Sequence, residues 1–390
     1  MYIESKMTAQ PNFSSNYSWE EWLMMNRGPK RLNMNIVVPI TVVYVVIFAT
    51  GVIGNIAVCL VIARTRILHT ATNFYLASLA MSDLTLLLLG LPNDLSLYWQ
   101  PYPWTYGLAV CKLRAVVSEM SSYTSVLTIV AFSMERYLAI CHPLYTYSMS
   151  GLRRAMWIIC ALWIVSFVCA LPFAVYTKVN YIDYPPNSGI TVAESAFCGL
   201  LKENIPPNAP IYELSTICFF LVPMFIIVLL YVRISRVVRD RNRHSIVNSV
   251  LGENYHNKAR KSVIRMLTAG VVTFFLCWAP FHLQRLLYIY IPNSAPYWYE
   301  INEWLYYITG CFYYFSSTVN PFLYNVMSVK YRLAFRQLLC WTETNSSVQG
   351  ESVGLHLAHR RQPKTDEIND GGFIQLRTIS QRVDRISFTN

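Results

Sequence analysis

The chain has 390 residues, of which 54% are hydrophobic and only 14% are charged. This balance excludes an ordinary soluble protein, in which about a quarter of the residues are charged. The net charge of +11 does not indicate nucleic-acid binding, because the basic residues lie between long apolar segments rather than along one face. We therefore expect a membrane protein with no nucleic-acid partner, in which the basic residues set the orientation.

Seven apolar segments are long enough to be membrane helices. A hydrocarbon core about 30 Å thick takes roughly 20 helical residues to cross. Because several connections are short, successive helices should be antiparallel neighbours. We predict an all-α membrane protein, a seven-transmembrane helix bundle, with spans at residues 36–63, 72–98, 108–141, 152–176, 211–236, 258–291 and 298–327. Kinks are expected at the internal prolines Pro92, Pro172, Pro223, Pro280 and Pro321.

Residues 1–35 precede the first span and lack the apolar core of a cleavable signal peptide, so the first span should act as its own insertion signal. The sequons at Asn12 and Asn16 predict a glycosylated, extracellular N-terminus. An odd number of crossings then places the C-terminus in the cytoplasm, and the excess of Lys and Arg on that side agrees. One outer cluster departs from this rule, namely Arg27, Lys30 and Arg31.

The bundle region is expected to span residues 36–340. Its end, residues 329–339, alternates apolar and basic side chains at helical spacing, which predicts a short amphipathic eighth helix on the inner membrane lipid. Cys340 follows directly and is a candidate for palmitoylation. Residues 341–390 are polar and rich in Ser and Thr, so we expect a disordered cytoplasmic tail.

Asp83 lies near the middle of the second span, where an ionisable side chain costs at least about 2.5 to 3.5 kcal/mol. An acid in this position is a functional candidate. Asn55, Ser125 and Asn320 lie in other spans and can hydrogen-bond to it or share a monovalent cation with it. The alternative is a structural polar cluster that only fixes helix register.

Three charged residues are expected at the mouth of the bundle. Asp94 lies close to three helical turns beyond Asp83, Arg285 two turns beyond Trp278, and Glu119 about two turns inward of Cys111. Two acids and one arginine suit a ligand with a cation and a hydrogen-bond acceptor, such as a peptide. The alternative is a Glu119–Arg285 salt bridge that closes the pocket. Further ligand-binding candidates are His282, Tyr306 and Tyr314, although tyrosines also form interfacial belts.

A set of short motifs occurs in order, each in its expected span. The set comprises Gly54-Asn55, LAMSD at 79–83, Glu135-Arg136-Tyr137, Trp163, Pro223 with Tyr231, CWAP at 277–280 and Asn320-Pro321-Phe322-Leu323-Tyr324. Each motif alone is weak, but the ordered set resembles the rhodopsin-like family of G-protein-coupled receptors. The resemblance extends over roughly residues 36–340, and the motifs depart from it only at Glu135, where many members have Asp.

The resemblance implies roles for particular residues. Arg136, Tyr231 and Tyr324 would rearrange on activation, and Phe274 and Trp278 would transmit ligand contact. Asp83 would form a sodium-sensitive site. We therefore expect no cofactor other than an allosteric sodium ion at Asp83. Cys111 and Cys198 would form a disulfide. Leu144 would contact the heterotrimeric G protein. Tail residues such as Ser346, Ser347, Ser352, Thr378 and Ser380 are candidates for phosphorylation and arrestin recruitment, and the alternative is that serines and threonines of a solvated tail have no such role.

Longer stretches narrow the resemblance. Residues 118–137 and 278–287 are similar to the neuromedin U receptors and their arthropod relatives, the pyrokinin and CAPA receptors. That group implies an amidated peptide ending in Pro-Arg-X, whose arginine would pair with Asp94 or Glu119 while Arg285 meets a carbonyl or amide oxygen. It also implies a plasma-membrane receptor that couples to Gq and releases calcium.

Other classes of protein fit less well. An opsin needs a lysine in its seventh span, and none lies between Lys261 and Lys330. Monoamine receptors have an aspartate where this chain has Ser118. A receptor for an unrelated peptide remains an alternative, followed by a transporter or channel, which would show repeated halves or a continuous polar path. We expect no enzyme activity and no metal site, because the histidines are scattered.

Overall fold

The computed structural model describes residues 18–142, 151–247, 253–292 and 297–327, together with Leu333 and Phe335. Within these ranges only the backbone is described for residues 241–247, 253–267, 299 and 323–327. Several predictions lie outside the described residues, namely those for Asn12, Asn16, Leu144, Cys340, most of 329–339 and the tail at 341–390.

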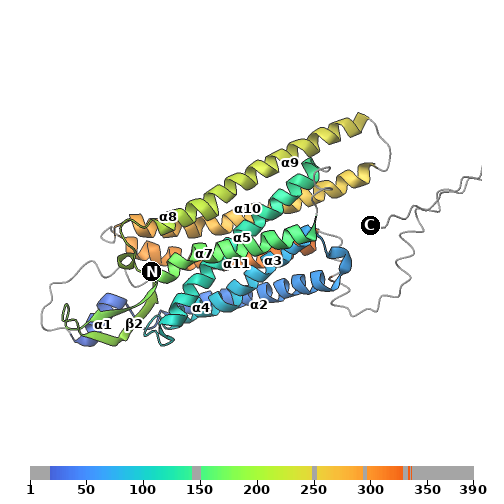
Figure 1. Cartoon of the computed structure of the whole chain (residues 1–390). Coiled ribbons are helices and arrows are strands. Elements are labelled where there is room, and N and C mark those ends of the chain that lie inside the picture. Colours follow the sequence, from blue (N-terminus) through green and yellow to red (C-terminus); the bar gives the residue numbers. More distant parts are fainter. Residues whose placement is uncertain are drawn as a thin grey trace, which may run out of the picture. The chain divides into compact units, whose positions relative to one another are not determined.

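Most of the described helices form seven rods, and these run side by side (Figure 1). They are α2 (Met34–Arg64), α3 (Ala71–Thr85) with η3 (Leu86–Gly90) and α4 (Leu91–Trp99), α5 (Gly107–Cys141), α7 (Leu152–Tyr176), α8 (Ile211–Thr216) with η5 (Ile217–Leu221) and α9 (Val222–Val247), α10 (Glu253–Tyr290), and α11 (Trp298–Met327). The predicted ends are close to these, except that α9 and α10 extend further toward each other than expected. The predicted seven-helix bundle is therefore confirmed.

The membrane helices differ in polarity. Among the described residues, five rods are long and apolar enough to cross a membrane on length and composition alone. The other two, α10 and α11, have buried polar side chains on their inner faces, including Gln284, Arg285 and Asn302. Buried polar side chains do not by themselves exclude a span, because α5, which is among the five, has Glu119 and Ser122 on its inner face.

Two of the predicted kinks coincide with changes in helix geometry. The π-helical turn η3 precedes Pro92, and the π-helical turn η5 precedes Pro223. A proline removes one backbone donor, and a wider turn accommodates the carbonyl that is left behind. Pro172, Pro280 and Pro321 lie inside continuous helices.

Gly54 allows α2 and α11 to approach closely. A Cβ atom on Gly54 would lie 2.9 Å from Cβ of Pro321, which is too close for any other residue without movement. Small residues serve this purpose widely in membrane helix packing. The contact places α2 beside the polar residues of α11 that precede Pro321.

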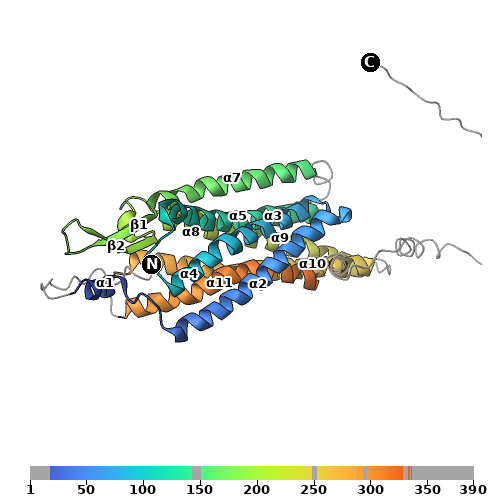
Figure 2. The same cartoon turned by 90° about the horizontal axis from the view of Figure 1, so that it is seen from below.

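One end of the bundle has structure that the spans did not predict. Strands β1 (Lys178–Asp183) and β2 (Thr191–Gly199) form an antiparallel hairpin, with Asn180 opposite Phe197 and a register shift between Asn180 and Ile182. The short helix α1 (Trp19–Arg27) lies at the same end (Figures 1 and 2). Its N-terminus is a capping box in which the Ser18 hydroxyl accepts from Glu21 N and the Glu21 carboxylate accepts from Ser18 N.

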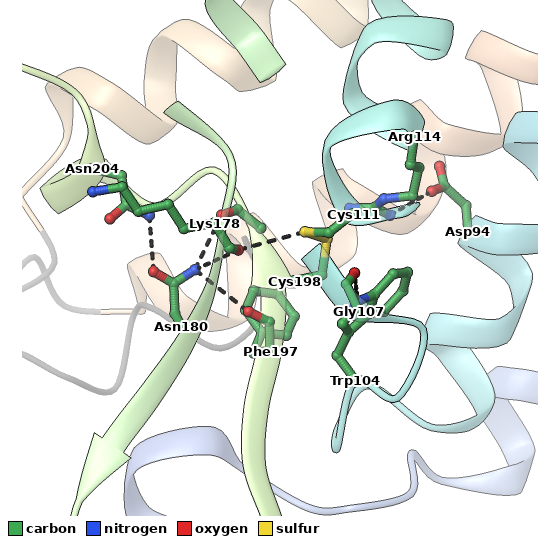
Figure 3. Close-up of a disulfide and its surroundings, with 11 residues drawn as sticks. Asp94, Trp104, Gly107, Cys111, Arg114, Lys178, Asn180, Phe197, Cys198 and Asn204 are labelled. Atoms are coloured by element: carbon green, nitrogen blue, oxygen red, sulfur yellow. Dashed lines mark hydrogen bonds and ion pairs between the residues drawn. A yellow bond between two sulfur atoms is a disulfide. The ribbon is translucent and has the colours of Figure 1, made fainter. Parts of the chain in front are cut away.

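The disulfide implied by the resemblance is confirmed. Cys111 near the start of α5 is bonded to Cys198 near the end of β2, with a Cα–Cα distance of 5.7 Å (Figure 3). The backbone N–H of Trp104 also donates to Ala196 O at 2.8 Å, which attaches the loop before α5 to the same strand. The hairpin is therefore fixed across the end of the bundle.

Candidate ligand-binding and signalling site

A cavity of about 200 Å³ opens at the hairpin end of the bundle. Its lining includes the predicted residues Asp94, Glu119, Arg285, Tyr306 and Tyr314. Helical phase alone had placed the three charged residues at one mouth, and the structure brings them together there. Side chains from the hairpin, Phe197 and Cys198, contribute to the wall.

Glu119 and Arg285 form a buried ion pair. Arg285 Nη2 lies 2.8 Å from Glu119 Oε1, and Arg285 Nη1 donates to Oε2 at 3.2 Å. The arginine and glutamate side chains are only 6% and 11% exposed. The rings of Phe173, Tyr212 and Phe281 surround the guanidinium. This is the salt bridge that the sequence offered as an alternative to ligand contact.

Asp94 belongs to a second ion pair that is more open to solvent. Its Oδ1 lies 3.0 Å from Nη1 of Arg114, and Tyr314 Oη donates to its Oδ2 at 2.7 Å. Figure 3 shows Arg114 on α5 reaching toward Asp94. The side chains of Arg114 and Asp94 are 18% and 27% exposed. Sequence reasoning missed Arg114, because an arginine within about two turns of a span end is ordinarily a snorkelling residue.

His282 lies one turn deeper than Arg285 and is not in the cavity wall formed by the described residues. Its Nδ1 is 3.2 Å from Thr216 Oγ1, and its ring stacks on Phe220 with centroids 4.9 Å apart. Both partners come from the segment of α8 and η5. The histidine therefore packs α10 against that segment instead of facing the ligand cavity.

Tyr313 of α11 lies in the cavity wall and contacts Trp278, and it was not among the ligand-binding or switch residues predicted above. Its hydroxyl lies 2.6 Å from Ser122 Oγ and 3.0 Å from Ser118 Oγ, both on α5. Its ring stacks on Phe281 and meets Trp278 edge-on at 5.4 Å. The predicted pair Phe274 and Trp278 is also stacked, with centroids 5.2 Å apart. Tyr313 thus joins three helices at the level of the expected transmission residues.

The polar cluster around Asp83 is buried at the centre of the bundle. Asn320 Nδ2 donates to Asp83 Oδ2 at 3.0 Å. Asn55 instead donates to Gly51 O and Ser317 O, and Ser125 Oγ lies 2.9 Å from Ser82 Oγ. A void of about 10 Å³ is lined by Asp83, Ser125, Trp278 and Asn320, among others. Carboxylate, hydroxyl and amide oxygens beside a space of this size fit a small hard cation.

At the opposite end of α5, Glu135 forms an ion pair with Arg154 of α7 at 2.6 Å. The Arg136 guanidinium lies 5.3 Å from the Phe132 ring centroid, and the Tyr137 hydroxyl lies 3.2 Å from His142 Nε2. The partner on α7 was not predicted for Glu135.

The remaining switch candidates lie on α9 and α11. Tyr231 is buried in a cluster with Ile227 and Phe132. Pro321 is inside α11 against Gly54. The backbone of Tyr324 is helical, and its side chain is outside the described residues.

Comparison with known proteins identifies the family. Residues 54–324 match the model of the seven-transmembrane receptors of the rhodopsin family. The chain belongs to this family. The resemblance drawn from the ordered motifs is therefore confirmed, and the chain is a multi-pass receptor of the plasma membrane and not an enzyme.

Individual receptors of this family are similar over most of the chain. The pyrokinin-1 receptor of Drosophila melanogaster is 38% identical over 366 residues, covering 80% of this chain and 82% of its own length. A neuromedin U receptor homologue of Caenorhabditis elegans is 37% identical over 390 residues, covering 94% of each. Neuromedin-U receptor 2 of Mus musculus is 37% identical over 323 residues, covering 83% of this chain and 80% of its own.

Proposed function

We propose that this receptor recognises an amidated neuropeptide ending in Pro-Arg-X and activates a heterotrimeric G protein of the Gq class, with release of calcium. The names of the similar receptors, pyrokinin and neuromedin U, support a peptide of this group. The relatives cover most of the chain, so the likeness includes the cavity as well as the switch region.

The observation on which the proposal depends is the carboxylate of Asp94 in the cavity. An arginine of the ligand needs an acid that it can reach and whose present partner it can replace. Asp94 meets both conditions better than Glu119, because its pair with Arg114 is more exposed to solvent than the pair of Glu119 with Arg285. Tyr314 holds the other carboxylate oxygen and fixes its direction toward the cavity.

The test is a calcium response in cells that express the chain, with untransfected cells as the control. Each amidated Pro-Arg-X peptide is compared with two partners, one with a free C-terminal carboxylate and one with glutamine in place of the arginine. We expect nanomolar to micromolar responses to the amidated arginine peptides and at least about tenfold weaker responses to both partners. Equal responses to the glutamine peptides, or a response only to peptides of another class, would overturn the ligand assignment.

We also propose that the N-terminus is extracellular and the C-terminus cytoplasmic. The Cys111–Cys198 disulfide supports this orientation, because disulfides persist in oxidising compartments. The ligand cavity is at the same end as the disulfide. An epitope tag ahead of residue 1 should stain intact cells, and a tag after residue 390 should stain only permeabilised cells.

The proposal for the inner side includes arrestin and membrane lipid as partners. Its support is the sequence alone, in the Ser- and Thr-rich tail and in Cys340 after the basic amphipathic stretch. Truncation after Cys340 should abolish agonist-dependent arrestin recruitment while the calcium response persists.

A further inference from the structure

We propose that Arg27, in the segment ahead of the first membrane helix, is a positioning residue of the ligand cavity that fixes Phe197 in the cavity wall. The N-terminal segment is then part of the binding site. The effect on peptide binding rests on the proposed function, whereas the arrangement of the segment itself does not.

Arg27 is fully buried although it lies outside the membrane spans. Its Nε donates to Ser195 O at 3.2 Å and its Nη2 donates to Asn180 O at 2.9 Å. These two carbonyls belong to opposite strands of the hairpin, next to the register shift between Asn180 and Ile182. A register shift interrupts the ladder of hydrogen bonds. The rigid, forked guanidinium bridges the two strands at this irregularity.

The same guanidinium contacts Phe197, whose ring lines the ligand cavity. The Arg27 Cζ atom lies 5.5 Å from the ring centroid. Tyr102 and Leu201 pack with Phe197 in one buried cluster. A Cβ atom on Gly199 would lie 2.6 Å from the ring, so glycine at this position leaves the space that the ring fills. The position of Phe197 in the cavity wall is therefore determined by Arg27 on one side and by close packing on the others.

The chain that follows Arg27 continues into the cavity wall. Tyr102 Oη donates to Gly28 O at 2.6 Å, which attaches the segment to the loop before α5. Trp22 of α1 donates from Nε1 to Asp183 O at 3.2 Å. Leu32, five residues beyond Arg27, lines the cavity and is only 7% exposed. Residues 18–32 thus form a lid with the hairpin, and Arg27 joins its parts.

This arrangement accounts for a feature that the orientation rule did not explain. Arg27 belongs to the outer basic cluster with Lys30 and Arg31, and the positive-inside rule disfavours such a cluster. Lys30 and Arg31 are exposed, whereas Arg27 is buried among carbonyls and an aromatic ring. Its presence outside the spans follows from its place in the lid.

The first experiment measures binding of a fluorescent amidated peptide ending in Pro-Arg-Leu to receptors at the cell surface. Arg27→Met should raise the Kd at least about tenfold, mainly through faster dissociation. Arg31→Met removes the same charge from an exposed site and should change the Kd less than about twofold. Phe197→Leu should also raise the Kd. The Kd of the double variant should be no higher than that of the single variant with the higher Kd, because both substitutions act through one contact. An unchanged Kd for Arg27→Met, or additive effects, would overturn the proposal.

The second experiment needs no ligand. Leu32→Cys is labelled with a membrane-impermeant thiol reagent, with Arg31→Cys as the exposed reference. Leu32→Cys should react at least about tenfold more slowly, and adding Arg27→Met should raise its rate toward the reference. If Arg27→Met does not reach the surface, Arg27→Lys replaces it, since lysine keeps the charge but lacks the fork.

The two experiments separate failure of the lid from failure of the proposed function. Equal rates for Leu32→Cys and Arg31→Cys in the otherwise unaltered receptor would refute the lid whatever the ligand is. If the labelling rates behave as expected but no Pro-Arg-X peptide binds the unaltered receptor, the lid stands and the ligand assignment fails.

Discussion

Arg285 binds both carboxylate oxygens of Glu119, at 2.8 and 3.2 Å, and three aromatic ring centroids lie 4.4 to 5.0 Å from its guanidinium. A ligand arginine that sought Glu119 would have to displace a guanidinium that is already paired and covered. The pair of Asp94 with Arg114 is more exposed. The sequence left Asp94 and Glu119 as equal candidates for the ligand's arginine, and the geometry favours Asp94.

The Glu119–Arg285 pair should matter for stability more than for ligand contact. Glu119→Gln leaves a buried guanidinium without its carboxylate, which costs about 3 to 5 kcal/mol in comparable buried pairs. We expect a large fall in the melting temperature of detergent-solubilised receptor and reduced surface expression.

The double variant Glu119→Leu with Arg285→Met is the control for this prediction. It removes both charges and should recover much of the lost stability. If Glu119→Gln were as stable as the unaltered receptor, the ion pair would not contribute to the stability of the fold.

Asp94 and Arg114 should have opposite effects on binding of a cationic peptide. Asp94→Asn removes the acid and should lower potency at least about tenfold, with surface expression unchanged. Arg114→Gln removes the competitor for that acid and should raise affinity. Competition binding measures both, and the glutamine-containing peptide should be insensitive to either variant. A loss of affinity in Arg114→Gln would mean that Arg114 itself contacts the ligand.

The spans and the switch motifs could be predicted because hydropathy and ordered motifs are local properties of the sequence. Pairings across the bundle could not, because Arg114 with Asp94 and Arg154 with Glu135 depend on how separate helices rotate and tilt. Helix α1 was missed although the Ser18 to Glu21 spacing is a recognisable capping box. Such a short helix is marginal alone, and its stability comes from packing on a hairpin that the sequence did not reveal.

Tyr313 should stabilise the bundle through its hydroxyl. Tyr313→Phe keeps the ring against Phe281 and Trp278 but removes the bonds to Ser118 and Ser122, so we expect a loss of about 1 kcal/mol or more per buried bond. Tyr290→Phe is the control, because Tyr290 is exposed and its hydroxyl donates to Glu213 at the protein surface. Thermal unfolding in detergent should show a clear decrease for Tyr313→Phe and little change for Tyr290→Phe. Equal shifts in melting temperature would show that the hydrogen bonds of Tyr313 between α5 and α11 do not stabilise the bundle more than an exposed tyrosine hydroxyl does.

Asp83 should make agonist affinity depend on sodium. The void beside Asp83 and Ser125 offers oxygen ligands to a small cation, and the only negative charge lining it among the described residues is the carboxylate. Asp83→Asn keeps the shape and the contact with Asn320 but removes that charge, so sodium should no longer bind. Agonist affinity is measured in sodium chloride and in choline chloride at equal ionic strength, which controls for screening. The affinity of the unaltered receptor for agonist should differ between the two salts, and Asp83→Asn should bind agonist equally in both. A sodium effect that persists in Asp83→Asn would place the cation elsewhere, and the polar cluster would then be left with the structural role of fixing helix register.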